Sequence, residues 1–256
     1  MIKRILNKIK NFIFEFKPNV EKNYITSKIG TIYGGYNIYE KNLKMPVVIS
    51  CGLGEDATFD VEMIKKHDAK IISIDPTPRA KDHYFKITKN FGIKNQYNYD
   101  ESGNLNVKCY DLTKVNENNF LFIFKAIWKN SSEKLKLFFP QNEEAVSCSI
   151  NFDPNSNTSF FLSDTIYYDE ILREHNLKQV DILKLDIEGA EIEVLKNILT
   201  SKNLPKQILV EFDIRRRPNY KNKKILENIH KKILQNYKLI NINKKGDFTY
   251  LLKNHD

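Results

Sequence analysis

The sequence predicts an α/β fold built on a mostly parallel sheet that ends in an antiparallel hairpin. A buried strand at 46–51, a glycine turn, a helix and a second strand at 70–75 follow one another within about 30 residues, the length of a βαβ crossover. Near the carboxyl end, strands at 237–243 and 248–252 are joined by Lys244-Lys245-Gly246-Asp247, a spacing typical of an antiparallel hairpin. The chain of 256 residues is long enough for one large domain with a core.

Apolar runs indicate the remaining elements. Residues 120–124 predict a central strand, and 126–128 with 135–139 predict a hairpin. Residues 140–158 are polar, rich in Asn and Ser, and predict a long functional loop. The last third contains, in order, a helix near 164–175, a strand at 181–186, a helix at 190–199, a strand at 207–214 and a helix containing Ile225, Ile229 and Ile233.

Residues 1–18 predict a basic amphipathic helix, which leaves 19–256 as the main domain. Apolar residues recur there at helical spacing, lysines and an arginine fill the other face, and Pro18 stops the pattern. Two interpretations stay open. The helix lies on an anionic membrane surface through residues 1–17, or it packs against its own domain or a second copy. Charges interrupt the apolar pattern too often for a signal peptide.

The net charge is +9 and is carried mainly by lysines. It indicates an anionic partner such as nucleic acid, a lipid surface or an acidic glycan, or else only an AT-rich genome, since Lys, Asn and Ile are all abundant. The cysteines Cys51, Cys109 and Cys148 lie far apart without metal-ligand spacing, which favours a reducing compartment. No apolar run approaches the roughly 18 residues of a membrane span. We therefore expect a cytoplasmic protein, with the inner face of the membrane as a second option.

Two acids, Asp186 and Glu188, follow the strand at 181–186 directly. Open α/β sheets bind their ligands at the carboxyl ends of parallel strands. The sequence therefore predicts negative charge in the ligand-binding crevice, which favours a positively charged ligand.

The first glycine turn, Gly52-Leu53-Gly54-Glu55-Asp56-Ala57, satisfies G-x-G-x-x-G/A. Asp75 ends the next strand, 21 residues beyond Gly54, where a carboxylate can accept hydrogen bonds from the ribose of an adenosine ligand. These features fit NAD and S-adenosylmethionine equally well. Glu55 and Asp56 would repel a pyrophosphate by about 1 kcal/mol each at an effective dielectric near 20, but would attract a sulfonium. The alternative is that Asp56 caps the helix and Glu55 faces water.

At this point the chain resembles a known family. Lys184, followed by Leu185-Asp186-Ile187-Glu188-Gly189-Ala190-Glu191, is similar to the K-x-D-x-E-G-A-E signature of FkbM-type S-adenosylmethionine-dependent methyltransferases. The runs Gly52-Leu53-Gly54-Glu55-Asp56 and Asp75-Pro76-Thr77-Pro78-Arg79 resemble one branch of that family, and the likeness extends from about residue 45 to the carboxyl end. It departs from the family where Ser50 and Cys51 replace an acid, and where Asp213 replaces a histidine.

The resemblance implies a class I methyltransferase fold, which is Rossmann-like, and O-methylation, often of a sugar hydroxyl. It also implies that Gly52, Gly54 and Asp75 hold the cofactor and that Asp186 lies beside the acceptor. Strand alternation predicts that Glu211 and Asp213 face one side of the strand 207–214, so that three carboxylates converge with Asp186. Three readings stay open: a Mg²⁺ site, a carboxylate base without metal, or a Glu211 that only pairs with an arginine or lysine.

We therefore expect an S-adenosylmethionine-dependent O-methyltransferase acting on a sugar in a glycan or glycolipid. The predicted cofactor-binding residues are Gly52, Gly54, Glu55, Asp56, Asp75 and Pro76, and the predicted catalytic residues are Asp186, Glu211 and Asp213. Arg215-Arg216-Arg217 either grips an anionic acceptor or forms a solvated loop. The alternatives are a nucleic-acid methyltransferase or binding module, weakened by the lack of an Asn-Pro-Pro-Tyr-like motif, and an NAD-dependent oxidoreductase.

Overall fold

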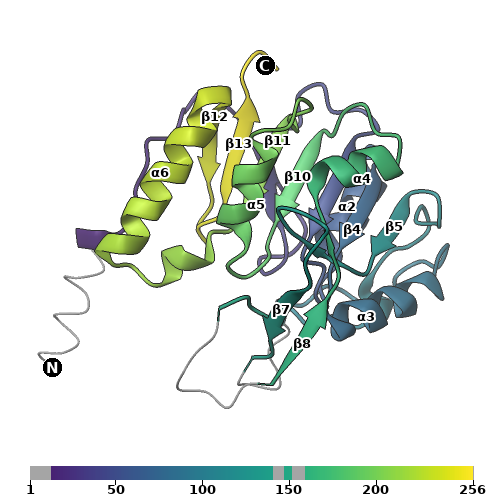
Figure 1. The fold of residues 1–256 in the computed structure, drawn as a ribbon. Coiled ribbons are helices and arrows are strands. Elements are labelled where there is room, and N and C mark those ends of the chain that lie inside the picture. Colours follow the sequence, from purple (N-terminus) through teal and green to yellow (C-terminus); the bar gives the residue numbers. More distant parts are fainter. Residues whose placement is uncertain (1–12, 141–146, 152–158, 256) are drawn as a thin grey trace, which may run out of the picture.

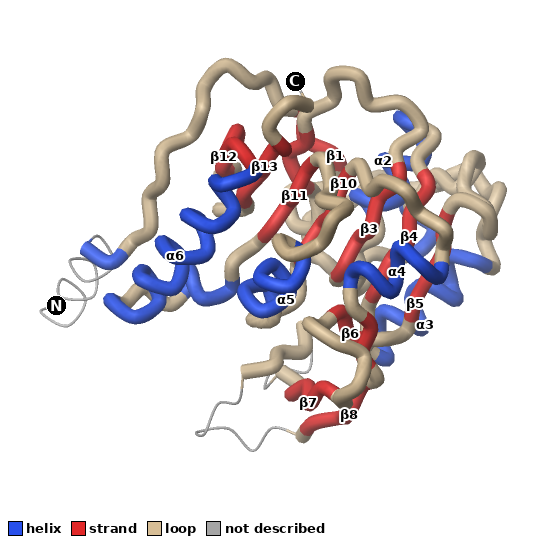
Figure 2. The backbone as a smooth tube through the Cα atoms, turned by 45° about the horizontal axis from the view of Figure 1, so that its top comes forward, coloured by secondary structure: helices blue, strands red, loops and turns tan. Residues whose placement is uncertain are grey.

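A computed structural model describes residues 13–140, 147–151 and 159–255 of the chain. Its centre is a seven-stranded sheet in the order β12-β13-β11-β10-β3-β4-β5 (Figures 1 and 2). Five neighbouring strands are parallel, and the last two form an antiparallel hairpin at one edge. The strands are β3 (Val47–Cys51), β4 (Lys70–Ile74), β5 (Phe120–Ile123), β10 (Ile182–Leu185), β11 (Gln207–Val210), β12 (Tyr237–Ile242) and β13 (Phe248–Leu252). The predicted mostly parallel sheet with a terminal hairpin is confirmed.

Helices cover both faces of this sheet, because its central strands are apolar on both sides. One core cluster joins Ile49 and Ile72 to the helices α4, α5 and α6, and the other joins Val48 and Ile71 to α2 and α3. The helices are α2 (Thr58–His67), α3 (Pro78–Thr88), α4 (Tyr168–Glu174), α5 (Glu191–Ile198) and α6 (Tyr220–Asn236). Adjacent residues of each strand thus pack into cores on opposite faces of the sheet. This packing fixes the positions of the ends of the parallel strands.

Three small strand pairs surround the main sheet. β1 (Ser27–Ile29) and β2 (Tyr36–Ile38) are antiparallel. β6 (Ala126–Ile127) pairs with β9 (Thr165–Ile166) in parallel, and β7 (Leu135–Phe138) pairs with β8 (Phe160–Ser163) in antiparallel register. The 3₁₀ helices are η1 (Val107–Cys109) and η2 (Asp213–Arg216). In Figure 1 the β7–β8 pair lies below the main sheet.

The predicted hairpin between 126–128 and 135–139 is wrong. β6 and β7 do not pair with each other; each takes a partner from the segment 160–166. Local patterns of apolar residues show that a segment is extended but do not name its partner. The helix near 164–175 begins only at Tyr168, because 165–166 form β9.

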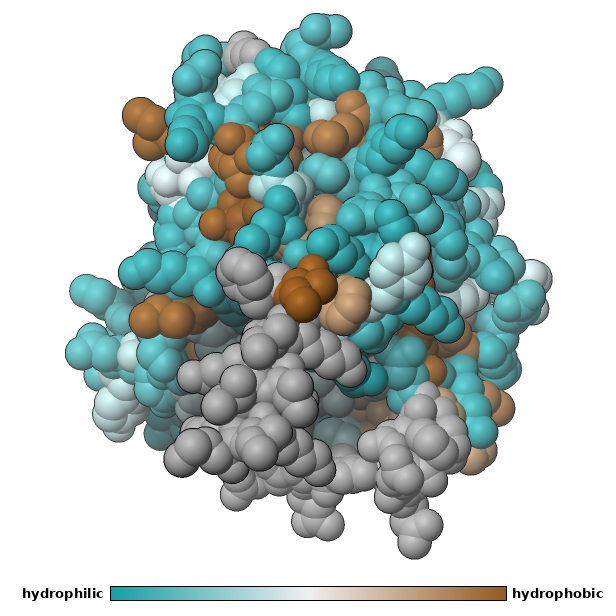
Figure 3. All heavy atoms as spheres, turned by 90° about the vertical axis from the view of Figure 1, so that its left-hand side faces the viewer, coloured by the Kyte–Doolittle hydropathy of each residue, from teal (hydrophilic) through white to brown (hydrophobic). Residues whose placement is uncertain are grey.

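Most of the predicted amphipathic helix at 1–18 and of the loop at 140–158 lies outside the described residues. Within the described part, Phe16 is buried, with its ring centroid 5.4 Å from that of His230 on α6 and 6.1 Å from that of Phe248 on β13. The end of the amino-terminal segment therefore packs on the domain itself. The face shown in Figure 3 is mostly hydrophilic, with hydrophobic side chains in small groups. No helix within residues 13–140, 147–151 and 159–255 is long and apolar enough to cross a bilayer.

Candidate active site

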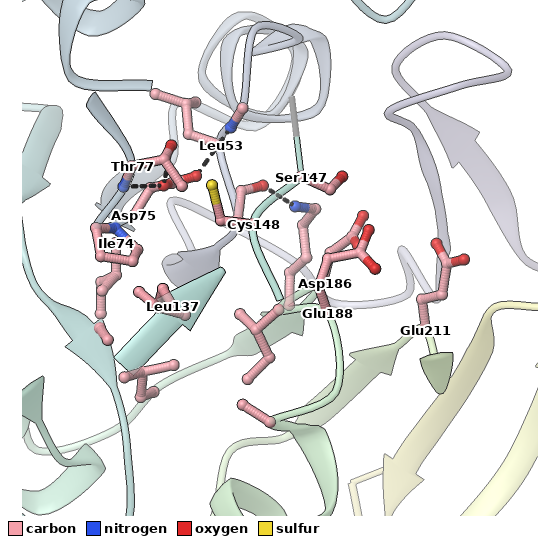
Figure 4. Close-up of a pocket in the computed structure, with 18 of the residues that line it drawn as sticks. Leu53, Ile74, Asp75, Thr77, Leu137, Ser147, Cys148, Asp186, Glu188 and Glu211 are labelled. Carbon is pink, nitrogen blue, oxygen red and sulfur yellow. Dashed lines mark hydrogen bonds between the residues drawn. The ribbon is translucent and has the colours of Figure 1, made fainter. Parts of the chain in front are cut away.

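A pocket opens at the carboxyl ends of the central strands β3, β4, β10 and β11 (Figure 4), and the first residue after each of them, Gly52, Asp75, Asp186 and Glu211, lines it. Its wall includes seven of the nine predicted site residues: Gly52, Gly54, Asp56, Asp75, Pro76, Asp186 and Glu211. Glu55 and Asp213 are not part of this wall. Figure 4 shows Asp75 and Thr77 on one side of the pocket, and Asp186, Glu188 and Glu211 on the other. The site thus has a half near β3 and β4 and a half near β10 and β11.

The glycines of the first turn have different roles. Gly52 has a φ of +87°, and a Cβ there would lie 1.9 Å from the carbonyl oxygen of Asp186. Only glycine permits this close approach of the ends of β3 and β10. Gly54 has a φ of +56° and nothing within 4 Å of an added Cβ. Gly54 therefore leaves open space on the pocket side of the turn, which a ligand can occupy.

Asp75 fastens the glycine turn to the end of β4. Its carboxylate accepts hydrogen bonds from the amide of Gly54 (3.0 Å) and from the amide and hydroxyl of Thr77 (2.8 and 2.6 Å). Burial raises the pKa of Asp75, and the hydrogen bonds from Gly54 and Thr77 oppose that shift. The carboxylate is therefore placed at the pocket wall by neutral donors.

The acids Glu55 and Asp56 do not act as an equivalent pair. Asp56 accepts hydrogen bonds from the amide of Thr58 at the start of α2 (2.9 Å) and from the hydroxyl of Thr31 (2.7 Å). Glu55 pairs with Arg79 at 2.6 Å and does not line the pocket. Asp56 thus binds the first amide of α2 from the position before the helix N-cap, so the capping interpretation describes it only in part. Glu55 is neutralised by a cation instead of facing water.

The acids on the other side of the pocket lie close together. The Tyr36 hydroxyl donates to Asp186 at 3.0 Å, and burial followed by the charge of Asp186 raises the pKa of Tyr36 well above its usual range. Glu188 has a φ of +46°, an uncommon conformation for a residue with a side chain. Burial, and after it the charge of Asp186, raises the pKa of the Glu188 carboxyl. Glu188 is therefore a better proton acceptor than an exposed glutamate.

Glu211 is held between two cations. One carboxylate oxygen contacts Arg216 and the other lies 3.1 Å from Lys245. Lys245 also donates to the carbonyl of Tyr33 at 2.8 Å. The pairing of Glu211 with an arginine and a lysine agrees with the third reading from the sequence, and its role in the reaction stays a prediction.

The predicted strand at 207–214 is too long. β11 ends at Val210, and Asp213 begins the 3₁₀ helix η2, so strand alternation does not bring Glu211 and Asp213 to one side. Asp213 is buried beside Asn151 (3.4 Å) and Arg217 (3.9 Å). Within residues 13–140, 147–151 and 159–255, no three His, Cys, Asp or Glu side chains are arranged to hold a metal ion. The predicted three-carboxylate Mg²⁺ site does not fit this geometry.

Four charged residues of the wall were not among the predicted cofactor-binding or catalytic residues, although the sequence had indicated Glu188 as a crevice acid: Lys184, Glu188, Arg216 and Lys245. The Lys184 ammonium donates to the carbonyl of Gly52 at 2.7 Å and is almost completely buried. Lys184 and Glu188 belong to the acidic signature, so this motif was the signal that could have identified them. Arg216 ends η2 and belongs to the arginine run that the sequence offered for an anionic acceptor, whereas Lys245 comes from the β12–β13 turn, where the sequence offered no signal.

Comparison with known proteins identifies the family. The model of the methyltransferase FkbM domain matches residues 13–238. A structure of a fibrillarin/Nop5p complex is similar with a TM-score of 0.40 and 10% identity, over 81% of this chain and 72% of that one. The Methanococcus jannaschii fibrillarin pre-rRNA processing protein has a TM-score of 0.41 and 12% identity, over 93% of this chain and 87% of that one.

The search of curated proteins finds no match. The match to the FkbM domain covers the glycine turn, the acidic signature and every strand of the parallel part of the sheet. The resemblance predicted from the signature is therefore confirmed. The chain belongs to the FkbM methyltransferase family, and it is a methyltransferase with a class I fold.

Proposed function

We propose that the protein transfers a methyl group from S-adenosylmethionine to a hydroxyl of a sugar in a glycan or glycolipid. The observation that carries the proposal is a single pocket with an open glycine turn on one side and two adjacent carboxylates, Asp186 and Glu188, on the other. The family implies S-adenosylmethionine, which supplies an electrophilic methyl group on a sulfonium when bound.

The residues near β3 and β4 fit that cofactor. Gly54 leaves space beside the turn, and Asp75 offers a carboxylate at the wall for ribose hydroxyls. Among the described residues, the wall carries five carboxylates and three cations, which favours a ligand with net positive charge. In this proposal Gly52, Gly54, Asp56, Asp75 and Pro76 hold the cofactor, and Glu55 acts through its pairing with Arg79.

The residues near β10 and β11 would receive the acceptor. Methyl transfer depends mainly on alignment, and a hydroxyl of high pKa gains from a base close to it. Asp186 and Glu188 are the candidates for the base, and the raised pKa of Glu188 makes it a stronger base than an exposed glutamate. Asp213 lies outside the wall, so we assign it a positioning role through Asn151.

The proposed sugar fits the mixed character of this wall. Arg216, Glu211 and Lys245 offer donors and acceptors, and Tyr33 adds a ring that is 41% exposed. A sugar ring presents hydroxyls along its edge and C–H groups on its face, so charged groups and an aromatic ring can bind it together. Location in the cytoplasm, and contact of residues 1–17 with the membrane, stay predictions.

Binding of S-adenosylhomocysteine tests the cofactor. At one hundred times its dissociation constant the ligand should stabilise the protein by about 2.7 kcal/mol, measured as a rise in melting temperature. Asp75→Asn should lose most of this rise, whereas Asp100→Asn, on an exposed loop, should retain it. A rise with NAD and none with S-adenosylhomocysteine would contradict the proposal.

Transfer of a labelled methyl group tests the acceptor. The labelled product from a sugar acceptor should be an ether that survives mild alkali, unlike a methyl ester. Asp186→Asn and Glu188→Gln should lower the rate of transfer by at least about a hundredfold if the carboxylate is the base. Label that appears in RNA instead of in sugars would show that the nucleic-acid alternative is right.

A further inference from the structure

A second cavity adjoins the active-site pocket and shares Glu211, Arg216 and Lys245 with its wall. Its other charged side chains are Arg215 and Glu15, and Phe212 and Pro218 add apolar surface. Among the residues that the structure describes, cations outnumber acids in this second cavity, whereas acids outnumber cations in the active-site pocket. The two cavities therefore differ in the charge of the ligand group that each one favours.

The cations of the second cavity are not equally engaged. Arg216 contacts Glu211 and lies 3.7 Å from Glu188, and Lys245 lies 3.1 Å from Glu211. Arg215 is different, because its nearest described carboxylate, Glu15, is 3.8 Å away, which is too long for a hydrogen bond. The buried Nε of Arg215 also has no acceptor among the described residues. Arg215 is thus the cation of this cavity with donors left to satisfy.

The Arg215 guanidinium is nevertheless held in a defined place. Its centre lies 5.7 Å from the ring centroid of Phe248, and a Cβ on Gly246 would lie 1.9 Å from its Nη1. The absence of a side chain at Gly246 is therefore what allows the guanidinium to fit against the hairpin turn. A fixed, incompletely satisfied guanidinium beside apolar surface suits a carboxylate or phosphate, which can accept two parallel hydrogen bonds from it.

We propose that this second cavity binds an anionic group of the acceptor, a carboxylate or a phosphate on the sugar, through Arg215. The inference rests on the proposed function, since it names the class of sugar that the same site would methylate. The anionic group would lie in the second cavity, and the sugar ring would lie over the shared wall with its reacting hydroxyl toward Asp186 and Glu188.

Binding of defined sugars to the complex with S-adenosylhomocysteine tests the proposal, with calorimetry as the readout. The probes are methyl β-D-glucuronide, glucose 6-phosphate and the neutral methyl β-D-glucoside. At least one charged probe should bind at least tenfold more tightly than the neutral one, and the better of the two tells whether the site prefers carboxylate or phosphate. Equal binding of all three, or no binding of either anion, would overturn the inference.

Two neighbouring arginines supply a matched pair of variants. Arg215→Gln should weaken binding of the preferred anion about tenfold, the equivalent of one charge-assisted hydrogen bond. Arg217→Gln removes the same charge from a side chain that is 68% exposed, compared with 26% for Arg215, and lines neither cavity. It should leave binding unchanged, and an equal loss in both variants would show that only net charge matters.

Further measurements separate the possible causes of failure. Arg215→Lys keeps the charge but loses the planar fork, so it should bind the anion between the wild type and Arg215→Gln. Melting curves of each variant report whether the loss of contact with Phe248 has unfolded the protein. If S-adenosylhomocysteine binds but no anion does, this inference fails and the proposed function stands. If S-adenosylhomocysteine does not bind, the proposed function fails as well.

Discussion

The two halves of the active-site pocket satisfy their acids in different ways. Near β3 and β4, Asp56 and Asp75 accept hydrogen bonds from neutral amides and hydroxyls. Near β10 and β11, Glu188 and Glu211 lie beside the cations Arg216 and Lys245. Neutral donors hold a carboxylate without cancelling its charge, whereas a cation holds it and cancels it.

The two halves therefore differ in how their carboxylates are held and not in their balance of charge. Among the described residues near β3 and β4, two carboxylates face one cation, Lys184, which donates to the Gly52 carbonyl, and this excess of acid suits a cationic methyl donor. Near β10 and β11, three described carboxylates face two cations, and Asp186 accepts from the neutral Tyr36 hydroxyl. We therefore expect backbone geometry to stabilise the half near β3 and β4, and ion pairs to stabilise the half near β10 and β11.

The largest expected effect comes from Gly52→Ala. A Cβ there meets the Asp186 carbonyl at 1.9 Å, and positive φ adds strain, so we expect a loss of about 3 kcal/mol or more in the free energy of unfolding. Gly92→Ala, at a φ of +78° with open space around it, should lose only about 1 kcal/mol. Urea unfolding measures both. Equal losses would show that backbone strain alone, and not the approach of β3 to β10, sets the cost.

The next effect is a dependence of stability on pH through Glu191, the last residue of the acidic signature. Burial raises the pKa of Glu191 to about 8, while its carboxylate accepts a hydrogen bond from the amide of Gly189 at 2.8 Å. A raised pKa means that the folded state binds more protons than the unfolded state, so stability falls as pH rises toward the folded pKa. Between pH 6.5 and pH 8 the fall should be about 2 kcal/mol.

Glu191→Gln should flatten this profile, since an amide does not titrate. Asp60 and Asp247, whose pKa values burial raises to about 6, and His83, whose pKa burial lowers to about 4, are present in both proteins, so the difference between the two profiles reports Glu191. Denaturant unfolding at several pH values measures the profile. An unchanged slope in the variant would assign the pH dependence to another group.

The smallest effect concerns the pairing of Glu211. Lys245→Met should lower the free energy of unfolding by about 1 kcal/mol, because Glu211, whose side chain is 9% exposed, loses one of its two cations. The double variant with Glu211→Gln should recover part of the loss. Lys244→Met, at the exposed neighbouring position, is the control and should change little. If the single and double variants are equally unstable, the pairing does not contribute to stability.

The half near β3 and β4 could be predicted from the sequence because it is local. The glycine turn and Asp75 follow two consecutive strands, and such strands lie side by side in a βαβ unit. The half near β10 and β11 could be predicted only in part. Asp186 and Glu211 follow strands that the pattern identified, but the length of β11 was overestimated, and with it the placement of Asp213.

The identity of the cations that pair with Glu211 lay beyond prediction for a physical reason. Arg216 and Lys245 are 29 residues apart and come from η2 and the β12–β13 turn, so only the pairing of β11 with β13 brings them to the same carboxylate. The predicted pairing of β6 with β7 was wrong for the same reason, because the periodicity of one segment carries no information on its partner strand. Strand pairing and ion pairs each require two segments of the chain, so the pattern of one segment does not predict them.

The parallel sheet and the glycine turn could be predicted from the sequence, since apolar periodicity and glycine act within a few residues of one another. Which carboxylates are held by neutral donors and which pair with cations depends on the folded chain. That outcome depends on donors brought from distant segments into a place with little water, where each contact changes the free energy of a charge.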